Sequence, residues 1–413
     1  MRSFLLLLCY LFAIYSFGQP KLTGKVTDAV TKKPIGNVSI FLSHTTIGTV
    51  SNDNGEFVIA NMPQGKFQLI ASSLNYENYI TTIEYPGKGD PLSIDMTPTE
   101  HTLQEVIVEP YDKDGWKNWG AYFKTHFIGN FSLIKNCKLL NPDAVKFRFT
   151  SKKNILRAFA HEKLVFENKS LGYRIQYLLT RFELDFTYNT FKYVGYPLFE
   201  NMVPKNLAEK KKWDSARVHI YRGSLRHFLR SIYTNQLIQE GFEVRAIKII
   251  TTEERERVSE INKVYDQMQE AGLKPRLRIQ KDSLDYYQKI KVLPDSVNKI
   301  ILNKLLPRES LVLASKRAQE TVETIVLQFP GALHISYLHK PVPYDYTSTQ
   351  LKISDKDVIT SEIELLFGKG ISIYTNGNYF NGENLIIEGY WSWSEKLSTM
   401  LPSDYWPETK KNS

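Results

Sequence analysis

Cysteine is almost absent from this sequence. Its 413 residues contain two, Cys9 and Cys137, and Cys9 lies in an apolar N-terminal run that we expect to be removed. A single remaining cysteine excludes an intramolecular disulfide. We expect Cys137 to be a small, buried apolar residue rather than a catalytic thiol, because free cysteines most often pack in this way.

Long apolar runs are also lacking. The longest extends from Phe4 to Phe17, which is shorter than the roughly 20 residues that span a bilayer. Arg2 precedes it, and the small residues Ser16 and Gly18 stand where a signal peptidase reads the chain. We therefore expect a signal peptide over residues 1–18, with cleavage before Gln19. An uncleaved membrane anchor is the alternative, and no transmembrane helix is expected later in the chain.

Several chemical motifs are missing. The sequence has no Gly-x-x-x-x-Gly-Lys, Gly-x-Gly-x-x-Gly or Cys-x-x-Cys motif, so nucleotide, dinucleotide and thiol–metal chemistry have no support. None of its eight His residues lies in His-x-x-Glu or His-Glu-x-x-His. His161 and Glu162 are adjacent, and on a strand they would point to opposite faces. We expect no metallopeptidase, no cofactor, no metal and no catalytic residue.

Charge is distributed unevenly along the chain. The formal net charge is +9, yet residues 20–110 carry six Lys and Arg against ten Asp and Glu, whereas residues 111–413 carry 46 against 34. This difference predicts a domain boundary near residue 110. The basic part either faces an acidic surface or simply carries solvated lysines. Nucleic-acid binding would fit the charge but contradicts an export signal.

Short alternating apolar runs at spacings near ten residues fill the first part, and aromatic residues make up 13% of the chain, which favours strands. Turn residues such as Asn54-Gly55 separate the runs. The pattern predicts a sandwich of about seven strands. The predicted strands are Leu22–Val26, Val38–Leu42, Gly48–Val50, Phe57–Ile59, Phe67–Ala71, Tyr79–Ile83 and Leu92–Met96.

Four spaced motifs occur in this part: they are Gly24-x-Val26-x-Asp28, Pro34-Ile35-x-Asn37-Val38-x-Ile40, Gly48-Thr49-x-Ser51-x-Asp53-x-Gly55-x-Phe57 and Pro63-x-Gly65-x-Phe67-x-Leu69. Together they resemble the carboxypeptidase regulatory-like domain, a transthyretin-like sandwich found in envelope proteins of Bacteroidota. The family usually has Gly-Tyr where this chain has Asn75-Tyr76, and Asn is a good substitute at a left-handed position. The resemblance implies a regulatory-like domain that accompanies peptidases and is not their catalytic unit.

Residues 103–108, Leu-Gln-Glu-Val-Ile-Val, resemble the stretch that follows this domain in TonB-dependent outer-membrane receptors. About 300 residues remain behind it, too few for the barrel of such a receptor. The resemblance therefore points to the same compartment, the periplasm or the outer membrane, rather than to a receptor.

The second part mixes predicted helices and strands. Trp116, Trp119, Phe123 and Phe127 predict a helix, capped by Asp114, that either packs on a sheet or contacts a membrane or sugar. Alternation from Tyr173 to Leu179 and from Phe182 to Tyr188 predicts a half-buried antiparallel sheet; barrel hairpins are the alternative. Helices are also predicted over 206–220, 224–240, 252–272 and, broken by prolines, 283–320. We expect the later strands, between residues 324 and 390, to share one sheet with those of 145–200.

The most site-like feature is a set of three arginines. Arg222, Arg226 and Arg230 are spaced by four residues, so we expect them to share one helix face with His227 nearby. Such a face binds phosphate, carboxylate or an acidic partner; the alternatives are solvation or ion pairs with Glu209 and Asp214. Residues 221–230 also resemble a block in uncharacterised Bacteroidota proteins with the same front domain, which implies grouping but no mechanism.

Two further features have structural alternatives. Ser224 and His227 are neighbours on a helix, but no Gly-x-Ser-x-Gly elbow or orienting acid accompanies them. The aromatic residues near the C-terminus either stack on a glycan or fix the last segment to the core: they are Trp391, Trp393, Tyr405 and Trp406.

The predicted organisation is a signal peptide (1–18), an all-β sandwich (19–98), a linker (99–115) and an α+β domain of unknown function (116–413). We expect a non-catalytic, exported envelope protein that binds a partner protein or a surface glycan, with peripheral outer-membrane contact left open. The alternatives are an enzyme of unknown class in the second domain and an accessory component of a TonB-dependent system. A closed cleft lined by the three arginines with a carboxylate or Ser would favour the enzyme; an open convex arginine face would favour binding.

Overall fold

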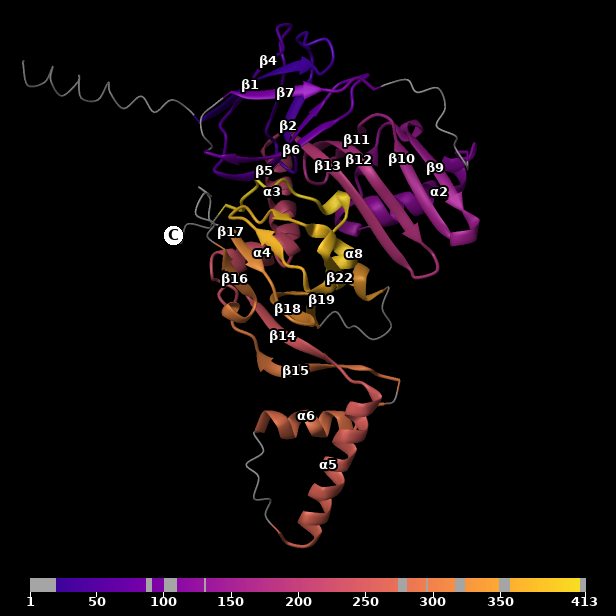
Figure 1. The fold of residues 1–413 in the computed structure, drawn as a ribbon, viewed down its shortest axis with the longest axis vertical. Helices are drawn as coiled ribbons and strands as arrows, with labels where there is room; N and C mark the ends of the chain where they lie inside the picture. The colour runs from indigo at the N-terminus through magenta and orange to yellow at the C-terminus, as the bar shows by residue number, and fades with distance from the viewer. Residues whose placement is uncertain are drawn as a thin grey trace, which may run out of the picture. The chain divides into compact units, whose positions relative to one another are not determined.

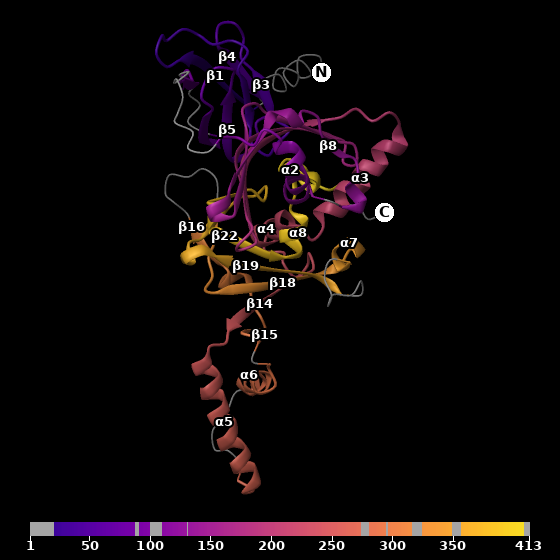
Figure 2. The same cartoon turned by 90° about the vertical axis from the view of Figure 1, so that its right-hand side faces the viewer.

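Seven strands at the N-terminus form a sandwich of two sheets. The computed structural model describes residues 20–86, 91–99, 110–129, 131–273, 281–294, 296–315, 324–348 and 357–408 (Figures 1 and 2). The predicted signal peptide and residues 103–108 lie outside them. The sheet orders are β4-β1-β7 and β3-β2-β5-β6. The strands are β1 (Lys21–Asp28), β2 (Ser39–Leu42), β3 (Gly48–Val50), β4 (Glu56–Ala60), β5 (Gly65–Ser72), β6 (Tyr79–Tyr85) and β7 (Leu92–Met96).

Alternating apolar residues build the core of this sandwich, as predicted. In β4, Phe57 and Ile59 are buried while the residues on either side of them are exposed, and Val26 of β1 and Phe67 of β5 are buried in the same cluster. Strand β7 runs parallel to β1, and the other pairs are antiparallel. The prediction of about seven strands in a sandwich is confirmed.

The motif residues of the sandwich have local structural roles. Gly55 has φ +74°, and a Cβ there would lie 2.3 Å from the carbonyl oxygen of Val26. Asn75 has φ +65°, so the left-handed conformation expected for this Asn is confirmed. The next residue, Tyr76, donates its hydroxyl to Oδ2 of Asp28 at 2.9 Å. Gly55 therefore allows a turn close to β1, and the hydrogen bond from Tyr76 fixes the turn after β5 to the end of β1.

A six-stranded sheet follows, in the order β8-β11-β12-β10-β9 with β13 paired to β12; β12 is antiparallel to β10 and β13. Its strands are β8 (Cys137–Leu139), β9 (Val145–Thr150), β10 (Ile155–Ala160), β11 (Leu164–Asn168), β12 (Tyr173–Asp185) and β13 (Thr190–Asn201). The first alternating run, 173–179, and the start of the second, 182–188, form one strand, β12, and residues 186–188 form a turn after it. The register of β12 shifts between Leu179 and Arg181. This bulge lets the alternation change phase without ending the strand.

Helix α2 (Gly115–Phe123) begins the predicted aromatic stripe. The ring centre of Trp119 lies 4.8 Å from that of Phe149, and Trp116 lies 6.0 Å from Phe147. These contacts favour the interpretation that the helix packs on a sheet. Asp112, two residues before the predicted cap Asp114, accepts the side-chain hydrogen bonds of Asn118 and Trp119.

The remaining chain contains two more antiparallel sheets and most of the helices. The orders are β15-β14-β18-β19-β22 and β16-β17-β20-β21. The strands are β14 (Phe242–Ile249), β15 (Lys299–Leu305), β16 (Val312–Ser315), β17 (Thr324–Leu327), β18 (Ala332–Pro341), β19 (Val358–Leu365), β20 (Ile371–Ile373), β21 (Tyr379–Phe380) and β22 (Leu385–Gly389). The helices are α3 (Leu207–Tyr221), α4 (Leu225–Tyr233), α5 (Thr252–Glu270), α6 (Lys281–Lys291), α7 (Tyr344–Thr347) and α8 (Tyr390–Ser394).

Two predictions for this region are wrong. The strands of 145–200 and those of 324–390 do not share a sheet, because strands near in sequence pair with each other: β12 pairs β13, and β18 pairs β19. The region predicted as broken helices, 283–320, contains α6 but continues into β15 and β16. The fold class, a sandwich followed by mixed helices and strands, is confirmed.

The chain divides into two compact units. The first comprises 1–120, 138–167 and 172–203, and the second comprises 121–137, 168–171 and 204–413. In the first unit, Phe41 and Ile70 of the sandwich form a buried cluster with Leu178 of the six-stranded sheet. The six-stranded sheet therefore belongs to the same unit as the sandwich. The sequence instead predicts one domain over residues 116–413, and those domain bounds stay a prediction.

Candidate functional site

The three arginines occupy three different environments. Arg222 is exposed and ends α3, where its φ and ψ of −63° and 123° are extended rather than helical. Gly223 then has φ +77°, and Ser224 caps α4 by accepting a hydrogen bond from the backbone N–H of His227. The prediction of one shared helix face is therefore wrong: only Arg226 and Arg230 lie on α4.

Arg230 is a structural residue. It is 2% exposed, and its guanidinium donates hydrogen bonds to the carbonyl oxygens of Asn376, Tyr405 and Ser403 at 2.9–3.0 Å. The Trp406 ring covers it, with the ring centre 3.6 Å from Cζ. All of its donor nitrogens are thus engaged within the protein.

His227 and Ser224 are also committed to local structure. Nδ1 of His227 accepts the backbone N–H of Gly223 at 3.2 Å, which leaves Nε2 as the donor to Glu240 at 2.9 Å. Burial lowers the pKa of His227, although Glu240 opposes the shift. Because the hydroxyl oxygen of Ser224 accepts from the backbone of His227, this pair has the geometry of a helix cap rather than that of a nucleophile and its base.

The predicted acidic partners pair elsewhere. Asp214 contacts Lys210 at 2.8 Å and Arg217 at 4.0 Å. A carboxylate oxygen of Glu209 accepts the backbone N–H of Lys205. Both acids thus stabilise α3 and its start.

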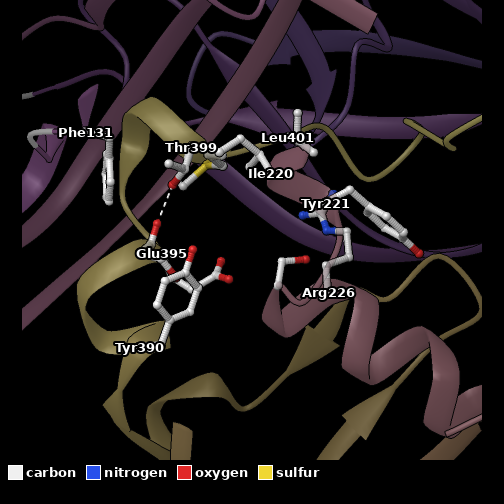
Figure 3. A pocket seen from close by; sticks show the side chains of 11 residues that line it. Phe131, Ile220, Tyr221, Arg226, Tyr390, Glu395, Thr399 and Leu401 are labelled. Carbon is white, nitrogen blue, oxygen red and sulfur yellow. Dashed lines mark hydrogen bonds between the residues drawn. The ribbon is translucent and has the colours of Figure 1, made fainter. Parts of the chain in front are cut away.

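Arg226 lines a pocket of about 60 Å³ in the second unit, shown in Figure 3. The walls come from the end of α3, the first turn of α4, α8 and the segment after it. The lining residues are Phe131, Ile220, Tyr221, Ser224, Arg226, Tyr390, Ser394, Glu395, Thr399, Met400 and Leu401. Of the predicted site residues, the pocket therefore contains Arg226 alone.

Arg226 and Glu395 set the electrostatics of this pocket. Burial lowers the pKa of Arg226 to about 10, with a smaller contribution from Arg230, so the guanidinium is still charged at neutral pH. Burial raises the pKa of Glu395, although the N–H of Leu225 and the charge of Arg226 oppose the shift. That N–H donates to Oε1 of Glu395 at 2.9 Å. One charged donor and one carboxyl group thus face the same small space.

Sequence reasoning missed Glu395, Tyr390 and Ser394 because they lie about 160 residues after the end of α4. The one feature of the sequence that could have indicated them is the Trp-Ser-Trp-Ser-Glu run at 391–395, in which an acid closely follows two large aromatic residues. Trp391 is 1% exposed and donates its indole N–H to the carbonyl of Gly223. This contact joins α8 to the loop before α4 and so shapes one wall of the pocket.

Other candidate groups offer little for chemistry. Enclosure of the Cys137 sulfur raises the pKa of its thiol to about 12, the opposite of an activated cysteine; the residue as a whole is half-buried. The described residues hold no group of three or more His, Cys, Asp or Glu side chains placed to bind a metal. In that same part of the chain, no helix has both the length and the apolar character to cross a membrane.

Comparison with known proteins identifies the front of the chain. Residues 22–108 match the family model described as the CarboxypepD_reg-like domain, about a fifth of the 413 residues. The resemblance of this part is confirmed, and it supports a non-catalytic, regulatory-like domain at the N-terminus. The match does not extend to the pocket.

The other two comparisons add little about the rest of the chain. No curated protein matches the sequence. Among solved structures, the chain is similar to the crystal structure of a 9R-lipoxygenase from Cyanothece, with 11% sequence identity and a TM-score of 0.15 over 54% of this chain and 48% of that one. The chain spans about half of the length of that protein, and a likeness of this size carries no argument about fold or activity.

Proposed function

We propose that this chain is an exported, non-catalytic protein of the cell envelope that binds a partner protein. The regulatory-like domain at residues 22–108 supports a role without catalysis at the front of the chain. In the second unit, Ser224, His227 and Arg230 are engaged in capping and packing contacts. Export, to the periplasm or the outer membrane, is supported by the sequence of residues 1–18.

The observation that carries the partner-binding proposal is the α5–α6 hairpin. It is inserted between the neighbouring strands β14 and β15 and projects from their sheet (Figures 1 and 2). A small cluster that includes Val258, Ile290 and Ile300 forms its core. Further along α5, Val264 and Met268 are 52% and 37% exposed. Because they are four residues apart, they lie on one face of the helix, and this exposed apolar pair is where we propose that the partner binds.

Glycan binding has less support. Two of the predicted stacking residues are packed into the second unit: Trp391 is buried, and Trp393 contacts Phe131 with ring centres 4.5 Å apart. Trp406 is 54% exposed, but its ring lies against Arg230. The interpretation that the terminal aromatic residues fix the last segment to the core is favoured. The three arginines form neither the closed cleft that would favour an enzyme nor an open convex face, because each lies in a different environment.

Photocrosslinking in native cells tests the partner proposal. A photoreactive amino acid at Val264 of the full chain is expected to capture one defined protein, and Met268→Glu is expected to abolish that product while leaving thermal unfolding unchanged. Exposed Lys152, in the first unit, is the control position. Capture of the same protein from position 152, or no capture from position 264, would contradict the proposal.

Fractionation of the same cells tests export. The mature chain is expected in the envelope fraction, and mass spectrometry is expected to show Gln19 as its first residue. A chain that begins at Met1 and stays in the cytosol would contradict the location while leaving the crosslinking result independent of it.

A further inference from the structure

Two arginines on α4 differ in how their donors are used. The guanidinium of Arg230 is satisfied by three carbonyl oxygens. One helical turn earlier, Nη1 of Arg226 is fully enclosed, and no hydrogen-bond partner for it exists among the described protein atoms. Leaving an enclosed charged donor unmatched is costly, on the order of 1–3 kcal/mol or more. The fold satisfies Arg230 with backbone carbonyls and leaves Nη1 of Arg226, a residue that lines the pocket, without a partner among the described atoms.

We propose that this pocket binds the carboxylate group of a small ligand, with Arg226 as the main recognition residue. A guanidinium presents parallel N–H donors that match the two oxygens of a carboxylate. Ser224 supplies a second donor: its oxygen already accepts the N–H of His227, so its O–H proton is available to the pocket. The hydroxyl of Thr399, by contrast, already donates to the carbonyl oxygens of Ser394 and Lys396.

The size and charge of the pocket favour a carboxylate over a phosphate. About 60 Å³ holds a small planar group or a few water molecules. The carboxyl group of Glu395 lines the same pocket as Arg226 (Figure 3). A negative charge on it would repel a dianion more strongly than a monoanion.

The ligand is therefore a monocarboxylate or the carboxylate end of a larger molecule. The lining by Phe131, Tyr390 and Leu401 suits a short apolar stem next to that group. This site is separate from the α5–α6 hairpin, so the proposal stands or fails independently of the partner-binding function.

Fluorine NMR of the full mature chain tests the proposal, with trifluoroacetate as the probe. Its signal is expected to broaden on binding and to sharpen again with excess acetate, but not with sodium chloride or phosphate at equal ionic strength. Arg226→Gln is expected to weaken binding by about tenfold or more, which corresponds to about 1.4 kcal/mol. Arg222→Gln, at the exposed arginine four residues earlier, is the matched control and is expected to bind like the wild type.

Equal broadening in the wild type and in Arg226→Gln, or no broadening at all, would overturn the proposal. If Arg226→Gln does not fold, Arg226→Lys retains the charge but loses the paired donors, and it is expected to bind more weakly than the wild type. Fluorine–proton contacts from the bound probe to the rings of Phe131 and Tyr390 locate it without any variant; contacts elsewhere would overturn the assignment. Competition by N-acetylalanine and by glucuronate, each against its methyl ester, distinguishes a peptide terminus from an acidic sugar, and acetate as the best competitor indicates a free short acid.

Discussion

The guanidinium of Arg230 lies 3.6 Å from the centre of the Trp406 ring, at a point where the last described segment of the chain meets α4. The same guanidinium donates to the carbonyls of Ser403 and Tyr405 in that segment and to that of Asn376 in a turn. One side chain therefore holds two loops against the helix. Its role is to stabilise the second unit, and the unmatched donor of Arg226 is left as the feature that points to a ligand.

Replacing Arg230 is expected to destabilise the second unit. Arg230→Ala leaves three carbonyl oxygens without their donor and removes the cation–π contact, at a cost of about 3 kcal/mol or more in the free energy of unfolding. Urea unfolding followed by tryptophan fluorescence measures the change. Arg222→Ala, at an exposed arginine, is the control and is expected to change the unfolding free energy by less than about 0.5 kcal/mol. Equal effects of the two variants would contradict a structural role for Arg230.

The arginine spacing shows where sequence reasoning stops. Spacing by four places residues on one face only if the helix is continuous, and Gly223 and Ser224 interrupt it between Arg222 and Arg226. Ser before an apolar run is a recognisable N-cap, so the interruption was predictable from the sequence. The contacts of Arg230 with carbonyls 146 or more residues away were not, because they depend on how distant loops pack.

The fold was predictable where its determinants are local. The seven front strands follow alternation and turn residues within about 80 residues, and each was predicted to within a few positions. The sheets of the second part depend on pairing between distant strands, such as β14 with β18, and alternation alone does not choose partners. For the same reason Glu395 could not be joined to Arg226 in advance.

Gly377 is expected to tolerate no side chain. Its φ is +74°, and a Cβ there would lie 2.8 Å from Cγ of Arg226 and 2.9 Å from Cγ of Arg230. Gly377→Ala combines left-handed strain with this clash, so it is expected to cost about 2–4 kcal/mol of stability. Gly368→Ala is a matched control, because Gly368 has φ +65° with no atom within 4 Å, and it is expected to cost only the strain of about 1–2 kcal/mol. Thermal unfolding of both variants measures the difference; a Gly368 variant as unstable as the Gly377 variant would rule out the clash.

His227 is expected to make stability depend on pH. Burial against the rings of Phe242 and Tyr337 lowers its pKa from 6.5, Arg230 and Arg222 act in the same direction, and Glu240 opposes them. Below pH 6.5 the unfolded chain binds a proton that the folded chain does not, so stability falls as the pH decreases towards the lowered folded pKa and is retained above 6.5. His227→Gln lacks this titration, and its loss of unfolding free energy between pH 7 and pH 5 is expected to be smaller than that of the wild type. Parallel pH profiles for the two proteins would show that His227 does not contribute.

In the front domain, substitutions of Asn75 test whether its position, where the family usually has Gly, requires a left-handed backbone rather than a particular side chain. Its side chain is exposed and its φ is +65°, so the cost of a substitution comes from the backbone. Asn75→Gly is expected to leave the stability nearly unchanged, because Gly adopts this conformation freely, whereas Asn75→Ala is expected to cost about 1 kcal/mol. Hydrogen-exchange mass spectrometry of peptides covering β5 and β6 measures the local effect, since these paired strands lead into and out of the turn. Asn54→Ala, at an exposed Asn outside the left-handed region, is the control, and faster exchange in the Gly variant than in the Ala variant would contradict the backbone explanation.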